Sequence, residues 1–250
     1  MQETSIRHCY NCGQQVEMNY CPKCGQQKIE LNLPLKEFMK DYIDEFFKFD
    51  SKILRSVVPL LIKPGYLTAE YISGKRARYL LPSRMYIIIS VIFFYIINKW
   101  DQVKAEDFGD IDLPTLAASK HLTMSEFTVR FQDQYNSLLP SFLLGVIPVF
   151  GLVLALLYIR RHRNLTNHLI FSFHFFAFFL LALIPTIVHG DIIVAACFGI
   201  SALYMFFALL RVYKQSIIMT IIKTLVLISS LILILAFYFK IVFWVTVGRL

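Results

Sequence analysis

Four cysteines near the amino end carry the strongest chemical signal in the chain. They form two Cys-x-x-Cys pairs, Cys9 with Cys12 and Cys21 with Cys24. A two-residue spacer lets both thiolates of a pair reach one ion, and two pairs supply the four soft, tetrahedral ligands that Zn²⁺ prefers. Because four protein ligands leave no open coordination position, the spacing predicts a structural zinc ion and not a catalytic one.

The residues around the cysteines favour the same interpretation. Gly13 and Gly25 follow the second cysteine of each pair, where a positive φ lets the backbone turn round the metal. Two disulfides are the alternative, but a cytoplasmic location keeps thiols reduced. Basic and acidic residues balance over residues 1–30, so the predicted ribbon lacks the positive field that phosphate binding requires. We expect a protein-docking or folding role and no nucleic-acid partner.

A basic cluster precedes the first apolar segment. From Lys63 to Arg84 there are five basic residues and one acidic residue, Glu70. Cations beside a span bind acidic lipid headgroups at about 1 kcal/mol each, but they also serve as an ordinary positive-inside determinant of topology. The candidate headgroup ligands, here named the basic collar, are Lys75, Arg76, Arg78 and Arg84.

Histidines in apolar sequence are the remaining candidates for chemistry. His174 is the imidazole deepest in an apolar segment, where it either forms a packing hydrogen bond or relays protons. His168 lies six residues earlier and points to a different helical face, which argues against a shared metal. No nucleophile lies beside a base, and no carboxylates are paired in or beside the apolar segments. The sequence therefore favours a noncatalytic protein.

The composition decides which solvent surrounds these residues. Hydrophobic residues make up 57% of the 250-residue chain and charged residues 17%, with a mean hydropathy of +0.58. Soluble chains carry about 25% charged residues, so a soluble monomer is excluded. An aromatic content of 15% also excludes a disordered tail. The chain is predicted to be an integral membrane protein.

Five apolar stretches match the length of about 20 residues that a helix needs to cross a bilayer. The first contains Arg84, whose guanidinium must reach back to the interface. Gly151-x₃-Ala155 and Ala195-x₃-Gly199 predict close helix packing. We expect an all-α membrane protein with a five-helix transmembrane bundle, whose spans are residues 80–98, 138–159, 169–188, 192–210 and 217–247.

Lysine and arginine residues predict the orientation of the spans. They cluster before the first span, between the second and third, and between the fourth and fifth, whereas residues 99–137 hold four basic and seven acidic residues. This pattern predicts a multi-pass protein of the cytoplasmic (inner) membrane, with the amino terminus cytoplasmic and the carboxy terminus outside. No cleavable signal precedes Cys9, so we expect the first span to direct insertion.

Shorter helices are predicted on both sides of the first span. Apolar residues at helical spacing over residues 35–47 predict an amphipathic helix, and a second helix follows from about residue 50 to Ile62. Thr123-x-x-Glu126 is a capping-box pattern that predicts a helix before the second span. The predicted domains are a zinc ribbon at 1–30, juxtamembrane helices at 31–79, and a transmembrane domain at 80–250 with an outer segment at 99–137.

These motifs together resemble a known family. The order is a CxxCG…CPxCGQ ribbon, an aromatic-rich helix, the Phe49 to Lys52 stretch, and then Pro-Gly, Glu-Tyr, Gly-Lys-Arg, Tyr and Pro before the first span. It is similar to bacterial membrane proteins catalogued as domain of unknown function 3667, over residues 9–97. Phe46-Phe47-Lys48-Phe49 replaces the Thr-rich, His-containing lead that members often carry. The resemblance implies a shared architecture and no activity.

Two functional hypotheses follow. The first is a noncatalytic interaction or regulatory protein, whose ribbon and amphipathic helices are coupled through the basic collar to the bundle, with a protein partner or a second copy of the chain. The alternative is a small transporter or lipid-handling protein that uses the collar, anionic headgroups and His174. This alternative predicts a continuous polar cavity from the collar toward His174.

Overall fold

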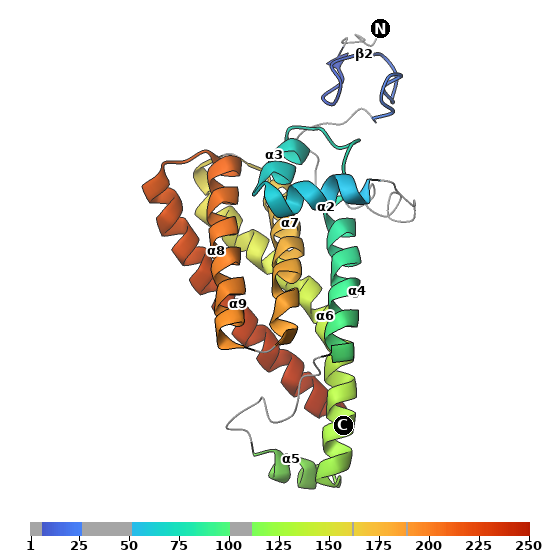
Figure 1. The fold of residues 1–250 in the computed structure, drawn as a ribbon, viewed down its shortest axis with the longest axis vertical. Coiled ribbons are helices and arrows are strands. Elements are labelled where there is room, and N and C mark those ends of the chain that lie inside the picture. Colours follow the sequence, from blue (N-terminus) through green and yellow to red (C-terminus); the bar gives the residue numbers. More distant parts are fainter. Residues whose placement is uncertain (1–6, 27–51, 101–111, 162, 189) are drawn as a thin grey trace.

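The computed structural model of the chain describes residues 7–26, 52–100, 112–161, 163–188 and 190–250 (Figure 1). The predicted amphipathic helix at residues 35–47 lies outside these ranges, as does most of residues 99–111. The described part is almost entirely helical, which confirms the predicted all-α class. Its one sheet pairs two short strands in the amino-terminal ribbon.

The ribbon is a small hairpin at one end of the molecule (Figure 1). Strand β1 (Arg7–His8) pairs antiparallel with β2 (Gln15–Val16). Two strands of two residues each bury little apolar surface, so backbone pairing alone leaves such a unit marginal in water. The cysteine cluster between and after the strands is therefore the main candidate for what stabilises it.

Two short helices lie between the ribbon and the long helices. Helix α2 (Ile53–Ile62) and helix α3 (Tyr66–Ile72) lie across one end of the bundle (Figure 1). Gly65 starts α3 with a φ of 68°, and a Cβ there would meet the Ala208 carbonyl oxygen at 2.7 Å. Gly74 follows the α3 cap residue Ser73 with a φ of 93°, the left-handed conformation that commonly ends a helix.

The long helices are consistent with the predicted membrane character of the chain. The carboxy-terminal part contains α4 (Pro82–Trp100), α5 (Leu113–Ser119), α6 (Met124–Leu157), α7 (Leu165–Leu183), η3 (Ile184–Val188), α8 (Asp191–Tyr213) and α9 (Ile217–Arg249), with η2 (Ile159–Arg161) between α6 and α7. Among the described residues, four helices are long and apolar enough to cross a membrane, namely α6, α7 together with most of η3, α8 and α9. The predicted first span corresponds to α4, which has 19 residues and is not one of these four.

Helix α6 differs from the sequence prediction. The predicted outer helix and the predicted second span form one helix of 34 residues, starting at the Thr123 capping box. No residue at the expected boundary, near Leu138, stops the helix, and Pro140 is accommodated within it. At 1.5 Å per residue the helix is about 51 Å long. It therefore exceeds the roughly 30 Å of a hydrocarbon core.

Helix α7 forms the centre of the bundle. It packs against α4, α6 and α8, and α3 covers part of its end. Gly151 on α6 allows the close approach that was predicted, because a Cβ there would lie 2.8 Å from Leu169 on α7. The matching prediction for Ala195 and Gly199 was wrong: both are exposed, and a Cβ at Gly199 would meet nothing within 4 Å.

Candidate metal centre and the basic collar

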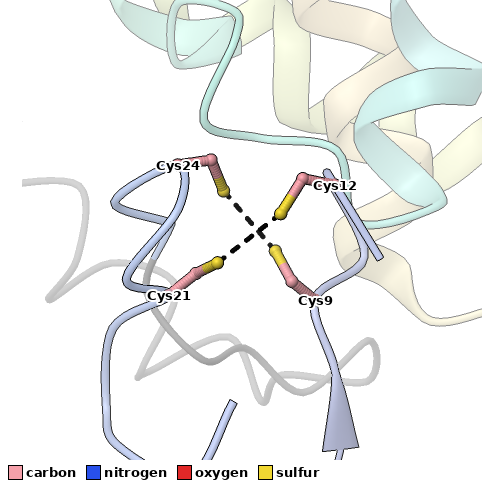
Figure 2. A group of neighbouring side chains, drawn as sticks. All are labelled: Cys9, Cys12, Cys21 and Cys24. Atoms are coloured by element: carbon pink, nitrogen blue, oxygen red, sulfur yellow. Dashed lines mark hydrogen bonds between the residues drawn. The ribbon is translucent and has the colours of Figure 1, made fainter. Parts of the chain in front are cut away.

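The four predicted ligands converge on one point (Figure 2). The Sγ atoms of Cys9 and Cys24 lie 3.6 Å apart, those of Cys12 and Cys21 lie 3.5 Å apart, and all four lie within 4.8 Å of one another. Sulfurs at about 2.3 Å from a central ion form a tetrahedron with edges of about 3.8 Å. All four are free thiols, so the disulfide alternative is not the arrangement present. The cluster can hold a metal ion.

The two cysteine pairs adopt the same local structure. In each, the first cysteine donates its backbone N–H to the residue five positions later, Gln14 or Gln26, at 2.8 Å. The glycine after the second cysteine donates back to the carbonyl of the first, with a φ of 76° at Gly13 and 68° at Gly25. These positive φ values confirm the predicted turn. Each glycine thus lets the backbone fold round its pair of sulfurs.

Hydrogen bonds and burial shift the pKa values of Cys24 and Cys12 in opposite directions. Burial raises the pKa of Cys24, but the Asn11 side chain and the Gln26 backbone amide lower it more, to about 6. For Cys12 the Gln14 backbone amide lowers the pKa, whereas burial and the other three thiols raise it to about 11. Without a metal, Cys24 therefore ionises more readily than Cys12. Binding of a divalent cation to these two residues would displace the proton of Cys12.

Gln26 connects the ribbon to the basic collar. Its side chain is buried and donates from Nε2 to the Gly74 carbonyl at 2.8 Å, while its Oε1 accepts from the Ala77 N–H at 3.2 Å. Its backbone belongs to the metal cluster, because its carbonyl accepts from Cys21 and its amide bonds to Cys24. One residue thus joins the second cysteine pair to the loop that carries Lys75 and Arg76.

The collar cations do not form one exposed cluster. Lys75 donates to both carboxylate oxygens of Glu70, at 2.8 and 3.1 Å. The Arg76 guanidinium lies 5.1 Å from the centre of the Tyr71 ring. Arg84 is buried in the first turn of α4, and Arg78 is exposed. The four predicted headgroup ligands therefore have four different surroundings.

The two histidines of α7 bind different neighbours. His174 shares a hydrogen bond of 2.9 Å between its Nδ1 and the Thr68 hydroxyl on α3, and its Nε2 has no partner among the described residues. His168 shares one of 2.8 Å with the Tyr213 hydroxyl on α8. Both imidazoles are buried and connect α7 to a neighbouring helix. This geometry fits the packing interpretation of His174.

The contact made by Gln26 was not predicted. The signal in the sequence is the repeat of Cys-Gly-Gln-Gln after each cysteine pair, which places Gln14 and Gln26 in equivalent positions. The repeat indicates a shared turn, but it gives no sign that one glutamine is exposed and the other buried. That difference arises because the Gln26 side chain bonds to Gly74 and Ala77 in the collar loop.

Comparison with known proteins finds a family that matches part of the chain. Residues 50–94 match the family described as Protein of unknown function (DUF3667). The match confirms the predicted resemblance over this range, which is narrower than the predicted residues 9–97 and does not include the cysteine ribbon. The matched range contains α2, α3, the basic collar and most of α4, and therefore includes the loop that Gln26 contacts. No curated protein and no solved structure matches the chain.

Proposed function

We propose that this chain is a noncatalytic inner-membrane interaction or regulatory protein, in which a zinc ribbon is coupled through the basic collar to a bundle of five transmembrane helices. The ribbon is cytoplasmic, the carboxy terminus is outside, and the ion is a structural Zn²⁺. The partner is another protein or a second copy of the chain. The orientation rests on the distribution of Lys and Arg, and the fifth span is α4.

The observation that carries this proposal is the double hydrogen bond of Gln26. A buried amide that both donates and accepts fixes the ribbon in one orientation on the collar, and a lost partner there costs about 1–3 kcal/mol. Because the Gln26 backbone also bonds to Cys21 and Cys24, metal loss would loosen the same residue. Metal occupancy, or a protein that binds the ribbon, would therefore act on the collar.

The surroundings of the collar support a coupling role over transport. The Tyr71 ring contacts the Arg76 guanidinium on one side and the His174 ring, with centroids 6.3 Å apart, on the other. Tyr71 is buried and packs with Leu81 and Ile170. Aromatic and aliphatic packing between the collar and His174 is what a static joint needs, whereas the transport alternative requires polar surface there.

The test compares two glutamines in equivalent positions. In Gln26→Ala the Ala77 amide loses its acceptor, so we expect its hydrogen exchange to accelerate severalfold in the protein reconstituted in nanodiscs. Gln14→Ala changes an exposed side chain and should leave that exchange unchanged. Zinc content should stay the same in both variants. Removing zinc from the unaltered protein with a chelator should reproduce the Gln26→Ala effect.

Two outcomes would contradict the proposal. Exchange at Ala77 that responds neither to Gln26→Ala nor to zinc removal would mean that ribbon and collar are not coupled. Isolation of the chain from native membranes as a lone polypeptide with catalytic activity would contradict the noncatalytic interaction role. Crosslinking before extraction should instead recover a reproducible partner, which Gln26→Ala weakens.

A further inference from the structure

Helix α2 carries an apolar face that no described part of the chain covers. Its outward side chains are between 37% and 76% exposed, namely Ile53, Leu54, Val58, Leu61 and Ile62. Leu54, Val58, Leu61 and Ile62 follow the spacing of one helical face. Five large apolar residues in a helix of ten form a patch that water solvates poorly.

The opposite side of α2 is fixed to the protein. Leu60 and Ser56 are fully buried, and the Ser56 hydroxyl accepts from the backbone N–H of Leu80 at 2.8 Å, which ties α2 to the collar segment. Helix α2 also packs against α3 and α7. The direction of the apolar face is therefore set by contacts on the buried side.

The position of α2 determines whether water or lipid surrounds its apolar face. Figure 1 shows α2 lying crosswise over the end of α4, close to the level of the turn between α8 and α9. Helix α4 also exposes apolar side chains, namely Val91, Ile92 and Tyr95. In the transmembrane arrangement proposed above, on which this inference rests, a crosswise helix at the end of the bundle lies near the depth of the lipid headgroups.

The charged residues within α2 and directly next to its two ends have one sign. Lys52, Arg55 and Lys63 are basic, and no acidic residue occurs from position 52 to 69. Arg55 flanks the apolar face, and the Lys63 ammonium lies 5.4 Å from the centre of the Tyr66 ring. Basic residues beside an apolar helical face are typical of helices that lie in an anionic lipid interface.

We propose that α2 is an interfacial helix that inserts its Leu54, Val58 and Ile62 face into the cytoplasmic leaflet, with Arg55 and Lys63 beside anionic headgroups. The occupant of the face is the anionic bilayer and not another protein. The same helix holds the collar through Ser56. The collar therefore has one attachment to the lipid surface through α2 and a second to the ribbon through Gln26.

The test measures where an indole at Val58 lies. Val58→Trp, and independently Leu54→Trp, are made in a background in which Trp100 and Trp244 are replaced by phenylalanine. The proteins are reconstituted in vesicles of phosphatidylglycerol and phosphatidylcholine, with bromine placed high or deep on the acyl chains. Met18→Trp on the exposed ribbon serves as the aqueous control and Leu233→Trp on α9 as the deep control.

We expect bromine placed high on the acyl chains to quench the tryptophan fluorescence of both α2 variants severalfold more than that of Met18→Trp. Bromine placed deep on the acyl chains should quench both α2 variants less than Leu233→Trp. Quenching of Val58→Trp should be stronger with phosphatidylglycerol than with phosphatidylcholine alone, and Arg55→Gln with Lys63→Gln should remove that difference. Aqueous iodide quenching α2 as strongly as the ribbon would overturn the proposal. Shielding from both iodide and brominated lipid would also overturn it, because protein would then cover the face.

Discussion

Gln14 and Gln26 have the same neighbours in sequence and different surroundings in space. Both follow a Cys-x-x-Cys-Gly turn and both accept the backbone N–H of the first cysteine. Only Gln26 is buried, because its side chain completes two hydrogen bonds of the collar loop. An amide can satisfy a carbonyl and an N–H together, which no apolar side chain could do. The consequence of a substitution at either glutamine therefore depends on the tertiary contact.

The cysteine cluster gives the first prediction at the residue scale. Cys21→Ser removes one of four thiolates and should abolish stoichiometric zinc binding, because the remaining site is open and its ligand shell incomplete. Elemental analysis of the purified protein measures the zinc content. Cys197→Ser is the control, since Cys197 lies in α8, away from the ribbon. Zinc content equal to that of the unaltered protein in Cys21→Ser would contradict the assignment of the site.

The ionisation of the same thiols gives a prediction for pH. Each thiol that is protonated in the metal-free ribbon must lose its proton to bind zinc, so affinity rises with pH until the pH exceeds its pKa. Cys24 stops contributing above about pH 6 because its pKa is lowered to about 6, whereas Cys12, with its pKa raised to about 11, still contributes. Chelator competition should therefore show affinity still rising between pH 6 and pH 9. A constant affinity over that range would contradict this.

At the scale of elements, the short helices α2 and α3 decide how the amino-terminal half meets the bundle. Helix α3 starts at Gly65, where the chain passes the backbone of α8, and Arg211 donates to the Pro64 carbonyl at 2.7 Å. Helix α6 starts at a local signal, the Thr123 capping box, but it continues through Pro140 and Pro148 while packed against α7 and α9. Because the backbone at Gly65 packs closely against that of α8, there is no room for a side chain at this position.

Gly65→Ala should destabilise the joint between α3 and α8. The new Cβ would face the Ala208 oxygen at 2.7 Å and the Ala208 Cα at 2.8 Å, and alanine disfavours a φ of 68°. We expect a loss of about 2–4 kcal/mol, measured as a lower midpoint of thermal unfolding in detergent. Gly199→Ala is the matched control, because open space surrounds it, and it should be neutral or stabilising by up to about 1 kcal/mol. Equal effects of the two substitutions would disprove the close approach.

At the scale of the whole molecule, the ribbon, α2, α3 and the turn between α8 and α9 gather at one end, and α5 lies at the other (Figure 1). The basic residues of the chain favour the ribbon end as cytoplasmic. A cytoplasmic ribbon also keeps its thiols reduced, so the metal chemistry and the topology require the same orientation.

Two variants, each with one cysteine added at one end of the molecule, test this orientation. Ser119→Cys on α5 and Ser73→Cys after α3 both replace exposed residues. A membrane-impermeant maleimide should label Ser119→Cys in intact cells and Ser73→Cys only after permeabilisation. The unaltered protein, with its five native cysteines, gives the background labelling. Labelling of Ser73→Cys, but not Ser119→Cys, in intact cells would reverse the proposed topology.

The spacing of residues along the sequence was sufficient to predict several features of this protein. The four thiols, the positive φ after each pair, the Thr123 cap and the apolar stretches of four long helices are properties of neighbours within a few residues. Such properties follow from ligand spacing, backbone sterics and helical periodicity, and they hold wherever the segment lies in space.

Contacts between distant residues were decided only by the tertiary structure. Gln26 meets Gly74 across 48 positions and Arg211 meets Pro64 across 147. The spacing of small residues did not predict that Gly151 lies against α7 while Gly199 is exposed. The spacing carries no information about which face of a helix packs against its neighbour. Helix rotation and docking depend on the packing of the entire bundle, so they emerge only when all elements are assembled.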